Sequence, residues 1–260
     1  MRVDVWSDVV CPFCYIGKKR LERVAAEAGI DLEIHWHSFE LDPDAPAKHD
    51  TSNTERLAKK YGRTYEEMEE MERNIAAMAA SEGIDFQWQK ANSGNSFNAH
   101  RIIHLAQSKG LGNEAKEAFF HAYMTEGLAI GEREVVEEIA SRIGLDNAEV
   151  EYVLDTNELS DFVRHDEKIA REQLNVTGVP FFVFDQRIAL AGAQPREVLL
   201  QVLEKHKSKQ ILKKSSKMMR LFVLMNHVIF HRNRSTQLKC DQIVCFITIL
   251  AIERSKKRTI

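Results

Sequence analysis

The order of strand-like and helix-like patterns along this chain restricts its fold more than any other feature of the sequence. Residues 2–6 and 32–36 each alternate apolar and polar side chains, which is typical of a short strand. Between them, apolar residues recur at helical spacing from Pro12 to about Ala28, and Gly29 follows where such a helix would end. Strand, helix and strand in this order predict a βαβ unit with two parallel strands and a right-handed crossover.

A long helical segment separates this unit from a second pair of strands. Helical spacing dominates residues 53–173, where Gly and Asn positions divide the pattern into four or five helices and no strand is expected. Residues 179–184 and 187–191 predict two strands joined by a turn at Asp185-Gln186, and a helix is expected over residues 195–205. The predicted fold class is therefore α/β, in the order βαβ, all-helical insertion, ββα.

These patterns divide the chain into four parts. Residues 1–50 and 174–205 form the two halves of one α/β domain, residues 51–173 form the helical insertion, and residues 206–260 form a basic C-terminal extension. The extension holds 13 Lys and Arg but only 2 Asp and Glu, whereas the whole chain has a net charge of −3. Its apolar runs are shorter than the roughly 20 residues of a membrane span, and it has no nucleic-acid motif or aromatic platform. We interpret it as a weakly structured appendage, and expect neither a membrane nor a nucleic acid as a partner.

The spacing of the four cysteines points to a specific chemistry. The first strand follows Met1-Arg2 directly, without the apolar stretch of a secretory signal, which predicts a cytoplasmic protein whose thiols are kept reduced. Cys11 and Cys14 form a Cys-x-x-Cys pair, and Cys240 and Cys245 are separated by four residues. In a cytosolic chain, Cys-x-x-Cys is either a dithiol redox centre or half of a zinc site.

The position of Cys11 at the start of the first helix favours the redox reading. The positive end of a helix dipole stabilises a thiolate, which is the nucleophile in disulfide exchange. Cys14, one turn later, can attack a mixed disulfide formed at Cys11 and release the partner as a thiol. We therefore expect Cys11 to attack, and Cys14 to be the more buried residue and to resolve the mixed disulfide.

Pro180 opens the third strand, where a proline cannot donate a ladder hydrogen bond. A cis bond between Val179 and Pro180 would turn the Val179 backbone toward the Cys11 sulfur, ready to pair with an extended substrate. A trans proline on an edge strand is the alternative.

Five ordered motifs carry a resemblance to a known family. They are SDVVCPFCYIG at residues 7–17, FELDP at 39–43, NSFNAHR at 95–101, GVPFFV at 178–183 and GAQP at 192–195. Together they resemble the DsbA-like branch of the thioredoxin superfamily, and most closely its FrnE-type dithiol-disulfide oxidoreductases and isomerases. The resemblance implies a thioredoxin-like fold built from residues 1–50 and 174–205, exchange at Cys11 and Cys14, and a cis bond at Pro180.

The residue before the second cysteine departs from the pattern of one part of this family. Periplasmic DsbA proteins carry a histidine there, and this chain has Phe13. Without the charge of a histidine the Cys11 thiolate should be less stabilised and the disulfide less oxidising. This difference favours an isomerase or a reductase over an oxidant.

Other residues are candidates for the surroundings of the dithiol. The candidate substrate-binding residues are Pro12, Phe13, His100, Val179 and Pro180. His100 either faces the active-site cleft, where it binds substrate or transfers a proton, or is a solvated helix histidine.

Asp8 and Glu40 either tune the protons near the dithiol or are ordinary exposed carboxylates. Met68, Met71, Ile75 and Met78 form a stripe at helical spacing that is either an adaptable substrate surface or, as we favour, packing against the core.

The expected function is thiol-disulfide exchange with disulfide-containing proteins or small-thiol substrates. No cofactor and no metal are expected, with glutathione as an optional co-substrate, and the sequence indicates no oligomeric state. One alternative is a glutathione-dependent isomerase resembling 2-hydroxychromene-2-carboxylate isomerases, which typically have a serine where this chain has a cysteine. The other is a non-catalytic zinc-stabilised interaction protein, for which Cys240 and Cys245 would be the second ligand pair. The same two cysteines are also a candidate auxiliary dithiol.

Overall fold

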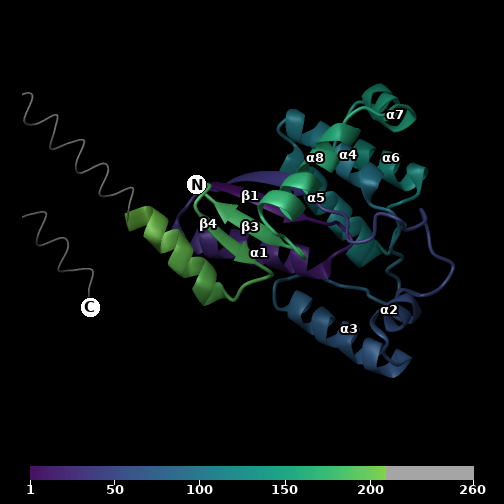
Figure 1. Ribbon diagram of the computed structural model, residues 1–260, viewed down its shortest axis with the longest axis horizontal. Coiled ribbons are helices and arrows are strands. Elements are labelled where there is room, and N and C mark those ends of the chain that lie inside the picture. Colours follow the sequence, from purple (N-terminus) through teal and green to yellow (C-terminus); the bar gives the residue numbers. More distant parts are fainter. Residues whose placement is uncertain (209–260) are drawn as a thin grey trace, which may run out of the picture. The chain divides into compact units, whose positions relative to one another are not determined.

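A four-stranded sheet organises the part of the chain that the computed structural model describes, residues 1–208 (Figure 1). Strands β1 (Arg2–Ser7) and β2 (Glu33–Ser38) run parallel. Strand β3 (Phe181–Phe184) is antiparallel to β1, and β4 (Ile188–Ala191) is antiparallel to β3. The order across the sheet is β2-β1-β3-β4, which confirms the predicted sequence of strands and their parallel first pair.

Helix α1 (Pro12–Ala28) connects β1 to β2 and has the predicted bounds. Cys11 is its N-cap residue, with an extended backbone, and a proline follows at the first helical position, where a missing N–H costs nothing. Gly29 ends the helix in the left-handed conformation, at φ 62°, and its N–H returns to carbonyls of the last turn. Local signals at both ends thus determine the length of α1.

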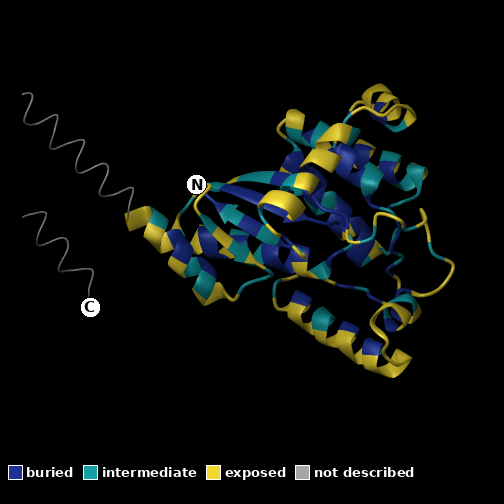
Figure 2. Ribbon diagram, in the orientation of Figure 1, coloured by how far each residue is buried: buried dark blue, intermediate teal, exposed yellow. Residues whose placement is uncertain are grey.

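Apolar side chains of β1 and β3 form the centre of the core. Val3 pairs with Phe184 and Val5 with Phe182, and each of these side chains is at most 1% exposed. Figure 2 shows this buried centre against the more exposed helices around it.

Nine helical elements lie between β2 and β3. They are α2 (Asn53–Tyr61), α3 (Tyr65–Ala80), α4 (Phe97–Ser108), α5 (Gly112–His121), the π-helical turn η1 (Ala122–Glu126), α6 (Arg133–Arg142), α7 (Asn147–Asp155), α8 (Ser160–Lys168) and the π-helical turn η2 (Ile169–Gln173). No strand interrupts this segment within the described residues, as predicted. The expected number of four or five helices is wrong, because α2, α7 and α8 have only nine residues each and give too few turns for a distinct periodic pattern.

The second half of the α/β domain matches its prediction closely. Asp185, Gln186 and Arg187 connect β3 to β4. Asp185 and Gln186 are left-handed, with φ values of 48° and 57°, and the Arg187 N–H donates to the Phe184 carbonyl at 3.0 Å and closes the turn. Residues 196–208 are helical and bury Leu199, Val202 and Leu203. Within the described part of the chain, no helix is both long and apolar enough to cross a bilayer.

A buried carboxylate attaches the helical segment to the sheet. Asp166 of α8 accepts hydrogen bonds from His37 Nδ1 at 2.7 Å and from the Ser38 backbone N–H at 2.9 Å, and it lies 3.1 Å from His104 Nε2. Its backbone carbonyl accepts the indole N–H of Trp6 at 3.0 Å. One residue therefore connects β1, β2 and α4 to α8.

Hydrogen bonds between Asp166 and its histidine partners determine which of these groups carry a proton. Burial alone would raise the pKa of Asp166, but hydrogen bonds with His104 and His37 hold it well below its usual range. Burial alone would lower the pKa of His37, but the hydrogen bond with Asp166 raises it. The folded state therefore favours an ionised Asp166 beside a protonated His37.

We predict that Asp166→Asn lowers the free energy of unfolding by about 2 kcal/mol near pH 5.5. The contribution of Asp166 to the free energy of unfolding is fully present above its unfolded pKa of about 4. It is lost as the pH falls through the lower pKa of the folded state. The contribution of His37 is complete below about pH 6.5 and is lost as the pH rises through its higher folded value. Urea unfolding from pH 3 to 9 should show the largest difference from wild type between about pH 4 and 6.5. A difference that does not vary with pH would contradict this account.

Candidate active site

The two cysteines of the Cys-x-x-Cys pair lie where β1 gives way to α1. Cys11 caps the helix, and the Cys14 backbone N–H donates to the Cys11 carbonyl at 3.0 Å. Cys11 is 5% exposed and lines a pocket, whereas Cys14 is 1% exposed and faces the interior. Cys14 is thus the more buried residue, as predicted.

The predicted partner of Cys11 on the other half of the domain is in place. The Val179–Pro180 peptide bond is cis, and the Cys11 thiol donates to the Val179 carbonyl, with a sulfur–oxygen distance of 3.6 Å. Gly17 of α1 permits this approach, because a Cβ there would lie 3.2 Å from Pro180 Cγ and 3.1 Å from the Phe182 ring. Residues 168 positions apart in the sequence therefore meet at one sulfur atom.

Phe13 and Pro12, between the two cysteines, form part of the rim of the pocket. The Phe13 side chain is 38% exposed, and Pro12 is half-buried. Both therefore lie where a substrate bound at Cys11 can touch them.

A buried lysine from the helical segment lies close to Cys14. The Lys116 side chain of α5 is fully buried and donates from Nζ to the Ser7 carbonyl at 3.2 Å, with its ammonium 5.4 Å from the ring centroids of Trp36 and Phe120. Burial lowers the pKa of Lys116 to about 8, against the opposing effect of the nearby thiols and Asp8.

Burial also dominates the chemistry of Cys14. It raises the pKa of the Cys14 thiol well above the usual range, and the hydrogen bond and charge of Cys11 raise it further. The Ser7 hydroxyl and the Lys116 ammonium act in the opposite direction. The environment of Cys14 therefore resists the ionisation of its thiol.

His100 lies in the interior, in a place that neither sequence-based alternative describes. It is 1% exposed, does not line the pocket, and its Nε2 lies 3.4 Å from Asp8 Oδ1, outside good hydrogen-bond geometry. Burial lowers the pKa of His100, and Lys116 lowers it further against the opposing effect of Asp8. The prediction of a solvated histidine is wrong, because α4 turns this side chain toward the core.

Asp8 and Glu40 are also fully buried, so the exposed-carboxylate alternative is wrong for both. Burial alone would raise the pKa of Asp8, but His100 and the backbone N–H of Leu41 hold it below its usual value. Burial raises the pKa of Glu40 to about 7, although Arg164 Nη1 lies 2.6 Å from its Oε1.

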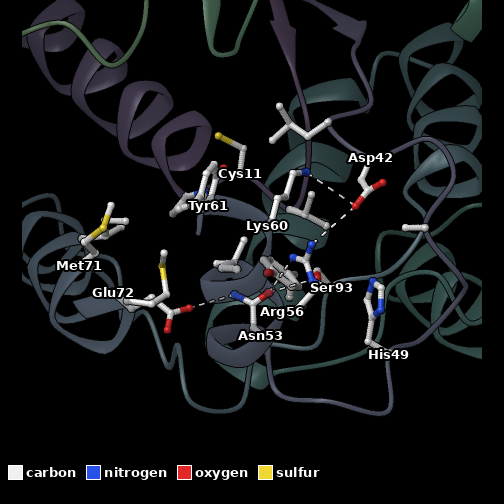
Figure 3. A pocket seen from close by; sticks show the side chains of 18 of the residues that line it. Cys11, Asp42, His49, Asn53, Arg56, Lys60, Tyr61, Met71, Glu72 and Ser93 are labelled. Carbon is white, nitrogen blue, oxygen red and sulfur yellow. Dashed lines mark hydrogen bonds and ion pairs between the residues drawn. The ribbon is translucent and has the colours of Figure 1, made fainter. Parts of the chain in front are cut away.

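A pocket of about 270 Å³ opens beside Cys11 (Figure 3). The loop after β2, helices α2 and α3, and residues 86–94 supply most of its other walls. Met68, Met71 and Ile75 of the predicted stripe line it, so these side chains face the dithiol pocket, while Met78 is an exposed residue outside the lining.

Two features of the site were missed by sequence reasoning. Lys116 carried a usable signal, because it occupies one of the buried positions of α5, residues 112, 115, 116, 119 and 120, which follow helical spacing. The polar residues of α2 that line the pocket carried no sequence signal of this kind.

Cys240 and Cys245 lie outside the described residues, and so does the rest of the basic extension beyond residue 208. Among residues 1–208, no three His, Cys, Asp or Glu side chains are grouped to hold a metal ion.

Comparison with known proteins identifies the family of this site. Residues 2–204 match the DSBA-like thioredoxin domain family. The crystal structure of a probable DsbA oxidoreductase from Streptomyces coelicolor is 37% identical, with a TM-score of 0.74, over 79% of this chain and 89% of that one. The uncharacterized protein YwbO of Bacillus subtilis is 28% identical over 211 residues, which are 81% of this chain and 99% of that protein.

Two more distant structures show the shared fold. A 2-hydroxychromene-2-carboxylate isomerase is 19% identical, with a TM-score of 0.59, over 83% of this chain and 98% of that one. The cytosolic disulfide reductase DsbM from Pseudomonas aeruginosa is 18% identical, with a TM-score of 0.56, over 80% of this chain and 100% of that one. The match of residues 2–204 spans both α/β halves, the dithiol and every helix between them. The chain belongs to the DSBA-like thioredoxin domain family.

Proposed function

We propose that this protein is a cytoplasmic thiol-disulfide oxidoreductase of the reductase or isomerase type, in which Cys11 attacks and Cys14 resolves. The observation that carries the proposal is the unequal placement of the two thiols. Cys11 caps α1 and lines a pocket, whereas Cys14 is 1% exposed beside a buried lysine. A nucleophile needs access to its substrate, and a resolving thiol needs access only to its neighbour.

The reaction has two exchange steps. The Cys11 thiolate attacks one sulfur of a substrate disulfide, the substrate S–S bond breaks, and one substrate thiolate leaves. Cys14 then loses its proton and attacks the Cys11 sulfur, which releases the second substrate thiolate and leaves a Cys11–Cys14 disulfide. Two electrons pass from the protein to the substrate, and the reverse sequence oxidises a dithiol substrate. In isomerisation, the released substrate thiolate attacks a different disulfide of the same substrate, and the thiolate displaced there attacks the mixed disulfide and releases the Cys11 thiolate.

The end of α1 assists the first step. The N-terminal end of a helix carries the positive end of the dipole, which favours the thiolate over the thiol. The Val179 backbone, whose carbonyl is 3.6 Å from the Cys11 sulfur, offers main-chain groups to an extended substrate at the same point. Phe13 supplies no charge to the thiolate, which is why we favour reduction or isomerisation over strong oxidation.

Lys116 assists the second step by acting on Cys14. The ammonium is fully buried, and in a medium of low dielectric constant its charge stabilises a developing thiolate far more than it would in water. With a pKa of about 8, Lys116 is also able to hold or give up a proton near neutral pH. We therefore propose that Lys116 is a positioning residue whose charge stabilises the thiolate that forms at Cys14.

The two alternatives from the sequence have less support. The contact of Cys11 with the Val179 carbonyl and its hydrogen bond with Cys14 support thiol-disulfide exchange, whereas the resemblance to a 2-hydroxychromene-2-carboxylate isomerase concerns the fold alone. A zinc site would need ligands from outside the described residues.

We predict that Cys11→Ser abolishes catalysed reduction of insulin disulfides and that Cys14→Ser arrests the reaction after the first step. Incubated with glutathione disulfide, the Cys14→Ser protein should accumulate one glutathionyl adduct on Cys11, which intact-mass and fragment spectra would show. Wild type should not accumulate this adduct, because Cys14 releases it. Catalysis that survives Cys11→Ser would refute the proposed function.

We predict that Lys116→Met slows the resolving step about tenfold at pH 7, which corresponds to about one pKa unit of lost thiolate stabilisation. Methionine has a similar length and needs no charge partner, so the fold should tolerate it. Rapid quenching and mass spectrometry would follow the decay of the mixed disulfide, whose pH profile should move to higher pH.

Lys109→Met, at an exposed lysine just before α5, is the matched control and should decay at the wild-type rate. An unchanged pH profile in Lys116→Met would contradict the assigned role.

A further inference from the structure

The pocket beside Cys11 is small, and its lining is partly apolar and partly polar. Its volume of about 270 Å³ is near the lower end for sites that enclose small organic molecules. The apolar part of the lining includes Phe13, Leu41, Met68, Met71 and Ile75. A cavity of this size accommodates a compact ligand with an apolar arm rather than a long stretch of polypeptide.

The polar part of the lining includes two residues with a buried nitrogen atom that has no hydrogen-bond partner among the described residues. These atoms are Arg56 Nε on α2 and His49 Nε2 in the loop before it (Figure 3). Arg56 is held in place by its other nitrogens, since Nη2 donates to Asn53 Oδ1 at 2.9 Å. An arginine has only donors, and its planar guanidinium matches a carboxylate, so Arg56 is the lining residue best suited to a ligand carboxylate.

The charges around Arg56 favour an anionic oxygen. Arg56 and Lys60 both face the Asp42 carboxylate, at 3.6 and 3.8 Å, beyond hydrogen-bond distance, and the charge of Glu72 also acts on Arg56. The other acidic side chain of the pocket, Glu72, accepts hydrogen bonds from Asn53 Nδ2 at 3.0 Å and Thr54 Oγ1 at 2.5 Å.

His49 is a further polar residue of the pocket lining. Burial and the charge of Arg56 lower the pKa of His49, against the opposing effects of Asp42 and Asp50, which favours the uncharged ring.

We infer that this pocket selects low-molecular-weight disulfides, and the thiols they yield, that carry a carboxylate on an apolar arm. The carboxylate pairs with the Arg56 guanidinium, the arm packs on Met68 and Met71, and the sulfur is presented to Cys11. The inference rests on the proposed exchange at Cys11. Each reduced protein molecule would convert one such disulfide into two thiols and end as the Cys11–Cys14 disulfide.

The test compares two disulfides that differ only in the anionic group, 2,2′-dithiodibenzoic acid and 2,2′-dithiodibenzamide. The second-order rate constant of thiol release is measured for each with the reduced full-length protein and with dithiothreitol, which reports intrinsic reactivity. The ratio of the rate constant for the acid to that for the amide should be about tenfold or more higher with wild type than with dithiothreitol. One charge-assisted hydrogen bond provides a preference of this size. Arg56→Gln should remove this preference.

Lys59→Gln is the matched control, because Lys59 is an exposed cation on the same helix and does not line the pocket. It should keep the wild-type preference. Asp42→Asn provides a second test, in which the preference for the acid should increase instead of being lost. Its result does not depend on whether the Arg56→Gln protein folds. Removal of the shared counter-charge should increase the preference for the acid at least twofold.

The outcomes separate this inference from the proposed function. A wild-type protein that reacts with both disulfides in the ratio shown by dithiothreitol would overturn the inference alone. So would an unchanged preference in Arg56→Gln or in Asp42→Asn. A reduced wild-type protein that reacts with neither disulfide would overturn the proposed exchange at Cys11.

Discussion

The difference in burial between two thiols three positions apart is the constraint on which the site depends. Cys11 caps α1 and opens onto a pocket, while the next turn of the same helix carries Cys14 into the core. Because burial penalises the charged form of a thiol, it raises the pKa of Cys14 and favours its protonated form. The rest of the fold maintains this inequality: the sheet supplies Val179 from the other side, and Gly17 lets α1 approach it closely.

The helical segment between the two α/β halves contributes to the chemistry as well as to the core. Helix α5 places Lys116 near Cys14, and α4 places His100 beside Asp8. Helices α2 and α3 form the pocket in front of Cys11, and α3 is otherwise mostly exposed (Figure 2). The network around Asp166 attaches α8 and α4 to the sheet, so the position of these helices relative to the dithiol is fixed by buried hydrogen bonds.

Features that depend on local chemistry were predictable from the sequence. A proline at the first helical position and Gly29 determine the bounds of α1, and the left-handed pair Asp185-Gln186 determines the hairpin, because each signal acts within a few residues. Features that depend on distant partners were not. The burial of Asp166 and His100 follows from how α8 and α4 pack on the sheet, and an isolated sequence pattern assigns such polar residues to the surface. The number of helices was underestimated for a related reason, since nine-residue helices owe their stability to packing.

The most direct test of the account is to measure which thiol reacts first with a small electrophile. Reduced protein treated with a limiting amount of iodoacetamide at pH 7 can be digested with trypsin, and fragment spectra of the peptide that contains both Cys11 and Cys14 locate the label. The account predicts carbamidomethyl label on Cys11, with Cys14 labelled only after unfolding. Equal labelling of the two cysteines in the folded protein, or a preference for Cys14, would contradict it.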